Sequence, residues 1–158
     1  MRAIWIALLG VALLAGSASG ASKGGSISLV AYSTPKDAYG KIISGFQKTQ
    51  AGSGINFNQS YGASGDQARA VAAGQDADLV ALSLDPDVNL LVGKGLVPKN
   101  WDANSHKGIV SDSVVVFVVR DGNPKHIKGW GDLVKPGVQV ITPNPFTSGG
   151  ARWNVMAA

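Results

Sequence analysis

The chain of 158 residues contains no cysteine, no glutamate and only two histidines. The absence of cysteine excludes disulfides, thiolate metal sites, a cysteine nucleophile and a lipoprotein anchor on cysteine. His106 and His126 both lie in loop-like contexts, where a solvated surface histidine is commoner than a catalytic base. The sequence also contains no G-x-S-x-G nucleophile elbow. These absences argue against an enzyme, and we expect none.

Runs of positive charge are also missing. Without Arg2, 13 basic residues remain against 10 acidic ones, all of them Asp, and they are scattered along the chain. A nucleic-acid surface would gather Lys and Arg on one face and interleave aromatic residues. We therefore expect no nucleic-acid partner, although the weak positive field would help an anion to arrive.

The only long hydrophobic run lies at the start of the chain. Arg2 precedes a nearly unbroken apolar segment at 3–15, and small residues follow at 16–21. The run is shorter than the roughly 20 residues that a membrane-spanning helix needs. This pattern predicts a secretory signal peptide over residues 1–21, with cleavage after Ala18, Gly20 or Ala21. An anchor that is never cut is the alternative.

Apolar strand-like segments alternate with helical patterns through the rest of the chain. This alternation predicts an α/β fold with a largely parallel sheet. The expected strands are 27–32, 55–60, 77–84, 114–119 and 138–142. The expected helices begin at Pro35, Asp66, Asp85, Trp130 and Ala151, and Trp101 to Gly108 reads as irregular.

Glycine is abundant, with 21 residues, and several glycines lie beside serines where a strand leads into a helix. Serine precedes a predicted helix in three loops, at Ser33, at 64–65 and at 148–150, and glycines follow the serine in the last two. The first amides of a helix have no intrahelical partner, and the helix dipole adds positive charge at that end. Together they suit an anion, and a serine hydroxyl adds a donor. Taken singly, each loop is more often an ordinary cap.

Phosphate-loop and metal motifs are not found. No lysine follows the glycines as in the G-x-x-x-x-G-K-[ST] loop, and G-x-G-x-x-G does not occur after a strand. The pairs Asp76/Asp78 and Asp85/Asp87 have the spacing of cation ligands, but they read better as strand-entry and helix-cap carboxylates because a hard cation needs six or more oxygens. We predict no metal and no cofactor.

Several stretches together resemble the periplasmic sulfate-binding and thiosulfate-binding proteins that serve ABC importers. The carrying segments are AYSTPKDAY (31–39), QSYGASGDQARAV (59–71), DADLVALSLDPDVN (76–89), VFVVRDGNPKHIKGWGDLVKPGVQVITPNP (116–145) and TSGGARWN (147–154). The resemblance covers essentially everything after the signal. It implies a two-lobed periplasmic-binding-protein fold (type II) that closes over one dehydrated sulfate held by neutral donors.

The resemblance also implies which residues hold the anion. They are the amide of Ser33, where family members often have Asp, then Ser64, the hydroxyl of Ser148, and the amides of Gly149 and Gly150. The other family contacts, including an indole, would lie beyond residue 158, so Trp153 is expected to pack beside the site instead. Sulfate near neutral pH only accepts hydrogen bonds, whereas a protonated phosphate would bury an unpaired donor at a cost of about 1–3 kcal/mol.

The expected organisation is a first lobe over residues 22–112 and the start of a second lobe over 113–158, with a crossover at 111–114. A helix has just begun where the chain stops, so we expect a longer parent, compared with which these residues alone bind the anion weakly or not at all. The expected partners are sulfate or thiosulfate and a membrane permease, with a monomeric chain in the periplasm. Binding of molybdate or phosphate, or an exported hydrolase, remain the alternatives.

Overall fold

The computed structural model describes residues 24–158. The predicted signal peptide at residues 1–21 lies outside the described residues. Within them, no helix has both the length and the apolar character needed to cross a bilayer.

The centre of the fold is a parallel sheet of three strands. The strands are β1 (Ser26–Tyr32), β2 (Asn56–Gly62) and β3 (Leu79–Ala81), in the order β2-β1-β3. The central strand pairs on both sides, with Val30 opposite Ser60 on one side and Val80 on the other. This arrangement confirms the α/β class and the first three predicted strands.

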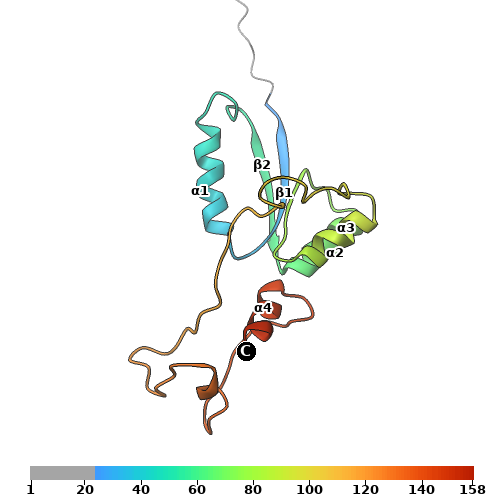
Figure 1. Ribbon diagram of the computed structural model, residues 1–158. Helices are drawn as coiled ribbons and strands as arrows, with labels where there is room; N and C mark the ends of the chain where they lie inside the picture. The colour runs from blue at the N-terminus through green and yellow to red at the C-terminus, as the bar shows by residue number, and fades with distance from the viewer. Residues whose placement is uncertain (1–23) are drawn as a thin grey trace, which may run out of the picture.

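Three helices cover the two faces of the sheet. They are α1 (Lys36–Gln47), α2 (Ser64–Ala72) and α3 (Asp85–Gly93). Figure 1 shows α1 on one side of the strands and α2 with α3 on the other. Successive side chains of a strand point to opposite faces, so the side chains of β1 alternate between the two helix layers.

Each face has its own small apolar core. Leu29 and Ala31 of β1 pack with Ile43 of α1. The intervening Val30 packs with Val71 of α2 and Leu91 of α3 on the opposite face. The sequence ISLVAY has apolar side chains on both faces of the strand, because helices cover both faces of the sheet.

The first three helices begin at or near the predicted residues: α1 at Lys36, α3 at Asp85, and α2 at Ser64, two residues before the predicted Asp66. Pro35 occupies the N-cap of α1, and no side chain caps that helix. Ser33 and Thr34 come just before this start but do not cap it, and the Ser33 hydroxyl donates to the Gly62 carbonyl instead. Gly74 follows the end of α2 with a φ of +109°, a value that residues with a β-carbon rarely adopt.

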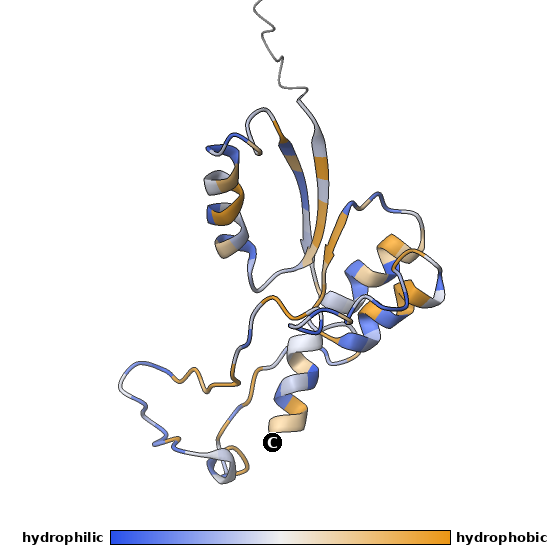
Figure 2. Cartoon of the chain, turned by 45° about the horizontal axis from the view of Figure 1, so that its top comes forward, coloured by the Kyte–Doolittle hydropathy of each residue, from blue (hydrophilic) through white to orange (hydrophobic). Residues whose placement is uncertain are grey.

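The predicted strands 114–119 and 138–142 are not formed. Among residues 24–158 neither segment belongs to a sheet, and many of their side chains are exposed, including Val118 at 94% and Ile141 at 97%. A strand needs the backbone of a neighbour to complete its hydrogen bonds, and these segments have none. In Figure 2 they form apolar stretches of an extended segment that leads away from the sheet.

Two short elements follow in this part of the chain. The 3-10 helix η1 (Trp130–Asp132) lies where a short helix was predicted, and Trp130 meets the ring of Phe117 edge to face at 4.7 Å between ring centres. The last helix, α4 (Gly149–Ala157), begins two residues earlier than predicted. Residues 101–108 form turns, as expected from their irregular sequence.

Candidate functional site

The carboxyl ends of all three parallel strands lie at one edge of the sheet. The loops there lead from β1 into α1, from β2 into α2 and from β3 into α3. Ligands of α/β proteins bind at this edge because the loops and helix starts converge there. Figure 1 places α4 beside the same edge, next to α2.

The first loop is tied to the second through Ser33. Its amide donates to the carbonyl of Gly62 at 2.9 Å, and its hydroxyl donates to the same oxygen at 3.1 Å. Both donors of Ser33 are therefore engaged with protein in this structure. An anion that takes the Ser33 amide would have to displace the Gly62 carbonyl.

The second loop begins α2 with a buried serine. Ser64 is 2% exposed, and its hydroxyl donates to Asp87 Oδ2 at 2.6 Å while its oxygen accepts the amide of Ser83 at 2.9 Å. The hydroxyl proton is thus committed to protein. The amides of Ser64 and Asp66 have no intrahelical partner, because the first intrahelical bond runs from the Gln67 amide to the Ala63 carbonyl.

The third loop begins α4 with a capping serine. The oxygen of Ser148 accepts the amide of Ala151 at 3.2 Å, and the carbonyl of Ser148 accepts the amide of Arg152. The amides of Gly149 and Gly150 come before these bonds and have no intrahelical partner. The Ser148 hydroxyl keeps its own proton to donate, since capping uses only its oxygen.

The second and third loops lie against each other. The amide of Gly65 donates to the carbonyl of Thr147 at 3.0 Å. The indole of Trp153 donates to the carbonyl of Ser83 at 3.1 Å, as a residue packing beside the site would. Gly149 touches Ser83 so closely that a β-carbon on it would lie 1.9 Å from the Ser83 hydroxyl oxygen.

The structure thus brings four of the five predicted site residues to one place and the fifth to its border. Ser64, Ser148, Gly149 and Gly150 meet where α2 and α4 begin, and Ser33 reaches them through Gly62. None of these contacts includes a ligand, so their role in binding stays a prediction.

Two neighbours of the site were not singled out from the sequence. Ser83 gave no signal, yet its hydroxyl oxygen is buried without a hydrogen-bond partner among the described residues. Asp87 was interpreted as a helix-start carboxylate, and its bond to Ser64 joins residues 23 positions apart. Such a pairing becomes visible only once α2 and α3 are packed side by side.

Two phenols near the first loop, those of Tyr39 and Tyr61, have raised pKa values. Burial raises the pKa of Tyr39 above its usual value, and Tyr32 and Tyr61 raise it further. Burial also raises the pKa of Tyr61, whose ring has the Lys36 ammonium 5.8 Å from its centre. These phenols therefore stay protonated near neutral pH and add no negative charge beside the loops.

Metal-binding clusters do not occur among residues 24–158. Both histidines are exposed. In the described structure, the backbone hydrogen bonds of each histidine join it only to residues of its own turn. The chemistry of the site is therefore that of amides and hydroxyls, which can bind an acceptor.

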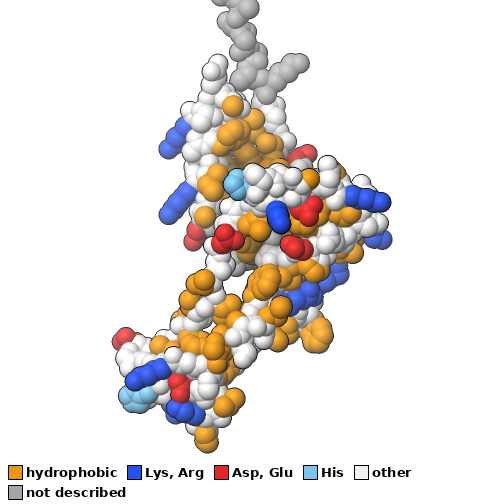
Figure 3. Space-filling view, in the orientation of Figure 1, with side chains coloured by type: hydrophobic (Ala, Val, Ile, Leu, Met, Phe, Trp, Pro, Cys, Tyr) orange, Lys and Arg blue, Asp and Glu red, His pale blue; other side chains and the backbone are white. Residues whose placement is uncertain are grey.

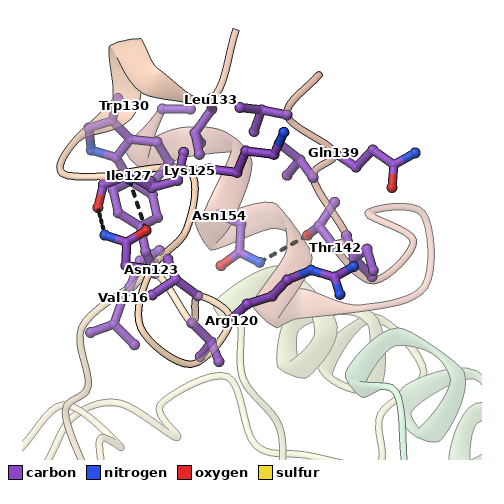
Figure 4. Close-up of a pocket in the computed structure, with 18 of the residues that line it drawn as sticks. Val116, Arg120, Asn123, Lys125, Ile127, Trp130, Leu133, Gln139, Thr142 and Asn154 are labelled. Carbon is purple, nitrogen blue, oxygen red and sulfur yellow. Dashed lines mark hydrogen bonds between the residues drawn. The ribbon is translucent and has the colours of Figure 1, made fainter. Parts of the chain in front are cut away.

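A hollow lined by other residues lies away from the loops. It encloses about 610 Å³ and is lined mainly by apolar residues of 115–142, with Trp130 and Leu133 on its wall. Figure 4 shows Arg120, Thr142 and Asn154 at its polar side. None of the five predicted site residues lines it. A dehydrated dianion needs converging hydrogen-bond donors rather than valine side chains, so this hollow does not change the prediction that the loops hold the anion.

Comparisons with known proteins agree with this architecture. Residues 27–158 match the model of the family described as bacterial extracellular solute-binding protein. A sulfate-binding protein of Synechococcus elongatus is 46% identical over 146 residues, which cover 90% of this chain and 42% of the relative. A thiosulfate-binding protein of Pseudomonas aeruginosa is 40% identical, covering 82% of this chain and 40% of the relative.

A solved structure gives the same result. The sulfate-binding protein SubI from Mycobacterium tuberculosis H37Rv superposes with a TM-score of 0.82 and 51% identity, over 84% of this chain and 46% of SubI. The chain therefore spans less than half the length of these relatives. All three are named for binding, which confirms the expectation of a binding protein rather than an enzyme. The chain belongs to the bacterial extracellular solute-binding protein family.

Proposed function

We propose that this chain captures sulfate or thiosulfate outside the cytoplasm, in the periplasm, and delivers it to the membrane permease of an ABC importer. The observation that carries the proposal is the pair of amides at Gly149 and Gly150, which have no intrahelical partner and lie beside the start of α2. The choice of anion rests on the names of the relatives, which are sulfate-binding and thiosulfate-binding proteins.

The donor set suits an anion that only accepts hydrogen bonds. The Ser148 hydroxyl would donate alongside the two glycine amides, and the helix dipole of α4 would add partial positive charge. From the other loop, Ser64 would contribute its amide rather than its hydroxyl, since the hydroxyl already donates to Asp87. Ser33 would join only after its amide leaves the Gly62 carbonyl.

We further propose that residues 22–112 and 113–158 belong to two lobes that move about a hinge at 111–114 when the anion binds. Binding between lobes biases such a hinge toward its closed state. The contacts that join the two parts at the site support this view because they are few and local: the Gly65–Thr147 and Trp153–Ser83 hydrogen bonds and the packing of Gly149. A hinge can make or break such a small set at low cost.

The test is an NMR titration of the signal-free chain labelled with ¹⁵N. Sulfate, thiosulfate, molybdate and phosphate are each added to tens of millimolar, with sodium chloride keeping the ionic strength constant. Saturable shifts of the Ser64, Gly149 and Gly150 amides with sulfate or thiosulfate are expected. Shifts that are absent, or that chloride reproduces in full, would overturn the proposal.

A further inference from the structure

The Asp87 carboxylate is buried although it lies in the first turn of a helix. It is 6% exposed, and it occupies the third position of α3. An acidic residue at this position commonly reaches back to the amide at its own helix start. Here it accepts the hydroxyl of Ser64 instead, at 2.6 Å, and so joins α3 to the start of α2.

The oxygen of Ser64 extends this link to a third segment. It accepts the amide of Ser83 at 2.9 Å, in the loop between β3 and α3. One buried hydroxyl thus fastens α2, α3 and the loop that touches Gly149. A hydroxyl has one proton, so only an acceptor such as the Asp87 carboxylate leaves the Ser64 oxygen oriented to receive the Ser83 amide.

Asp87 also lies close to Gly65, the residue of α2 that contacts the third loop. A β-carbon on Gly65 would lie 3.6 Å from Asp87 Oδ1 and 3.2 Å from the Thr147 carbonyl oxygen. The Gly65 amide donates to that carbonyl. The position of the α2 start relative to the α4 start therefore depends on how Asp87 holds Ser64.

The charge of Asp87 works against an anion nearby. A buried carboxylate repels a second negative charge more strongly than an exposed one does, because less water screens it. A carboxylate so close to the predicted oxyanion site therefore weakens anion binding by its charge, and its hydrogen bond to Ser64 offsets this effect only by positioning the donors. Charge and geometry therefore make opposite predictions for the removal of Asp87.

We propose that Asp87 is a positioning residue of the oxyanion site. It touches no ligand, and it holds Ser64 so that the free amides of α2 stay beside those of α4. This inference rests on the proposed function, because it concerns the same site. The residue acts through Ser64, so its effect should depend on the Ser64 hydroxyl.

The experiment compares sulfate affinities of variants in the same NMR titration. Asp87→Ala, which leaves Ser64 without its acceptor, should weaken sulfate binding about tenfold, the worth of one hydrogen bond to a charged group. Asp87→Asn, which still offers an amide oxygen to Ser64, should retain most of the affinity. Asp85→Asn is the matched control, since it removes an exposed charge from the same helix turn, and it should bind as the parent chain does.

A double-mutant cycle separates positioning from a general loss of structure. Asp87→Ala weakens binding in the parent chain, but once Ser64→Ala has removed the hydroxyl, a further Asp87→Ala change should cause no additional weakening, because the link is already broken. The dispersion of the amide spectrum reports whether each variant folds. If Asp87→Ala does not fold, Asp87→Leu takes its place in the cycle, because leucine fills a similar volume and accepts no hydrogen bond.

Three outcomes are distinguishable. Tighter sulfate binding by Asp87→Ala or Asp87→Asn in the parent chain would show that only charge matters and would overturn the positioning role. Additive effects of the Ser64 and Asp87 changes would overturn it as well. A parent chain that shows no shifts with sulfate would instead refute the proposed function itself.

Discussion

Gly149 offers the sharpest test of how α4 sits on the rest of the molecule. It is buried, and a β-carbon there would lie 1.9 Å from the Ser83 hydroxyl oxygen and 2.9 Å from Leu84 Cγ. For Gly149→Ala to regain ordinary contact, the start of α4 must move back by roughly 1.5 Å. Forcing a methyl into such a contact costs about 2 kcal/mol, or roughly thirtyfold in the docking equilibrium.

The neighbouring glycine is a matched control. A β-carbon on Gly150 meets only the Ser148 hydroxyl, at 3.7 Å, which is an ordinary contact. Alanine favours a helix over glycine by up to about 1 kcal/mol, so Gly150→Ala should keep or raise the stability of α4. The same glycine-to-alanine change therefore has opposite expected signs at adjacent positions.

Amide hydrogen exchange of α4 measures both effects. Gly149→Ala should lower the protection of residues 152–157, while Gly150→Ala should leave it equal or higher. The Trp153 indole proton, which donates to the Ser83 carbonyl, should exchange faster in the first variant only. Equal protection in the parent chain and Gly149→Ala would refute the close packing of α4 on the β3–α3 loop.

Three further predictions follow from single contacts. The pKa of Asp132 is lowered to about 2, mainly by its hydrogen bond from Lys135. The ionised carboxylate therefore stabilises the turn around η1 at pH values above the ordinary carboxyl pKa of 3.8, and this stabilisation is lost as the pH falls through about 2. The NMR shifts of the turn should titrate with that midpoint, and Lys135→Met should raise it. Trp153→Phe keeps a ring but removes the donor to the Ser83 carbonyl, and hydrogen exchange should show α4 docking weakened by about 1 kcal/mol. Val118, 94% exposed in an unpaired apolar segment, should drive concentration-dependent association that Val118→Lys suppresses in sedimentation velocity.

The predicted association through Val118 differs from the monomer expected from the sequence. Figure 3 shows apolar side chains gathered along the extended part of the chain that leads away from the sheet. An extended apolar segment with unpaired backbone groups is a template for pairing with another chain. Sedimentation thus decides between the monomer inferred from sequence and the association inferred from exposure.

The sequence predicts best where an element is decided by its own residues. Segment 27–32 reads as a buried strand because its apolar residues suit both faces, and β1 forms there. The helix patterns after Pro35 and Asp85 likewise produce α1 and α3. Their periodicity and helix-start residues are local properties, so a single sequence contains them.

Prediction fails where an element depends on a partner. VVVFVV at 114–119 has the strongest strand composition in the chain, yet it stays unpaired, because strand composition does not create the neighbouring backbone. The Ser64–Asp87 bond was missed for a related reason, since it depends on the packing of α2 against α3 rather than on spacing. The loops by themselves predicted only a general anion site built from ordinary helix caps. The resemblance to a family was needed to predict that the anion is sulfate or thiosulfate.

The loops are held by hydrogen bonds that use the donors of Ser33 and the Ser64 hydroxyl. They leave the Ser148 hydroxyl proton and the amides of Gly149 and Gly150 without a partner inside α4. Ser33 is fixed by Gly62, Ser64 by Asp87, and Ser148 by Ala151. A donor that is already oriented adds little ordering cost when a ligand arrives, and preorganised sites bind more tightly for that reason. A dehydrated anion needs this arrangement more than most ligands do, because the protein must replace its whole hydration shell at once. If the proposed site is correct, the close packing of serine and glycine at these helix starts orients the amides before the anion enters.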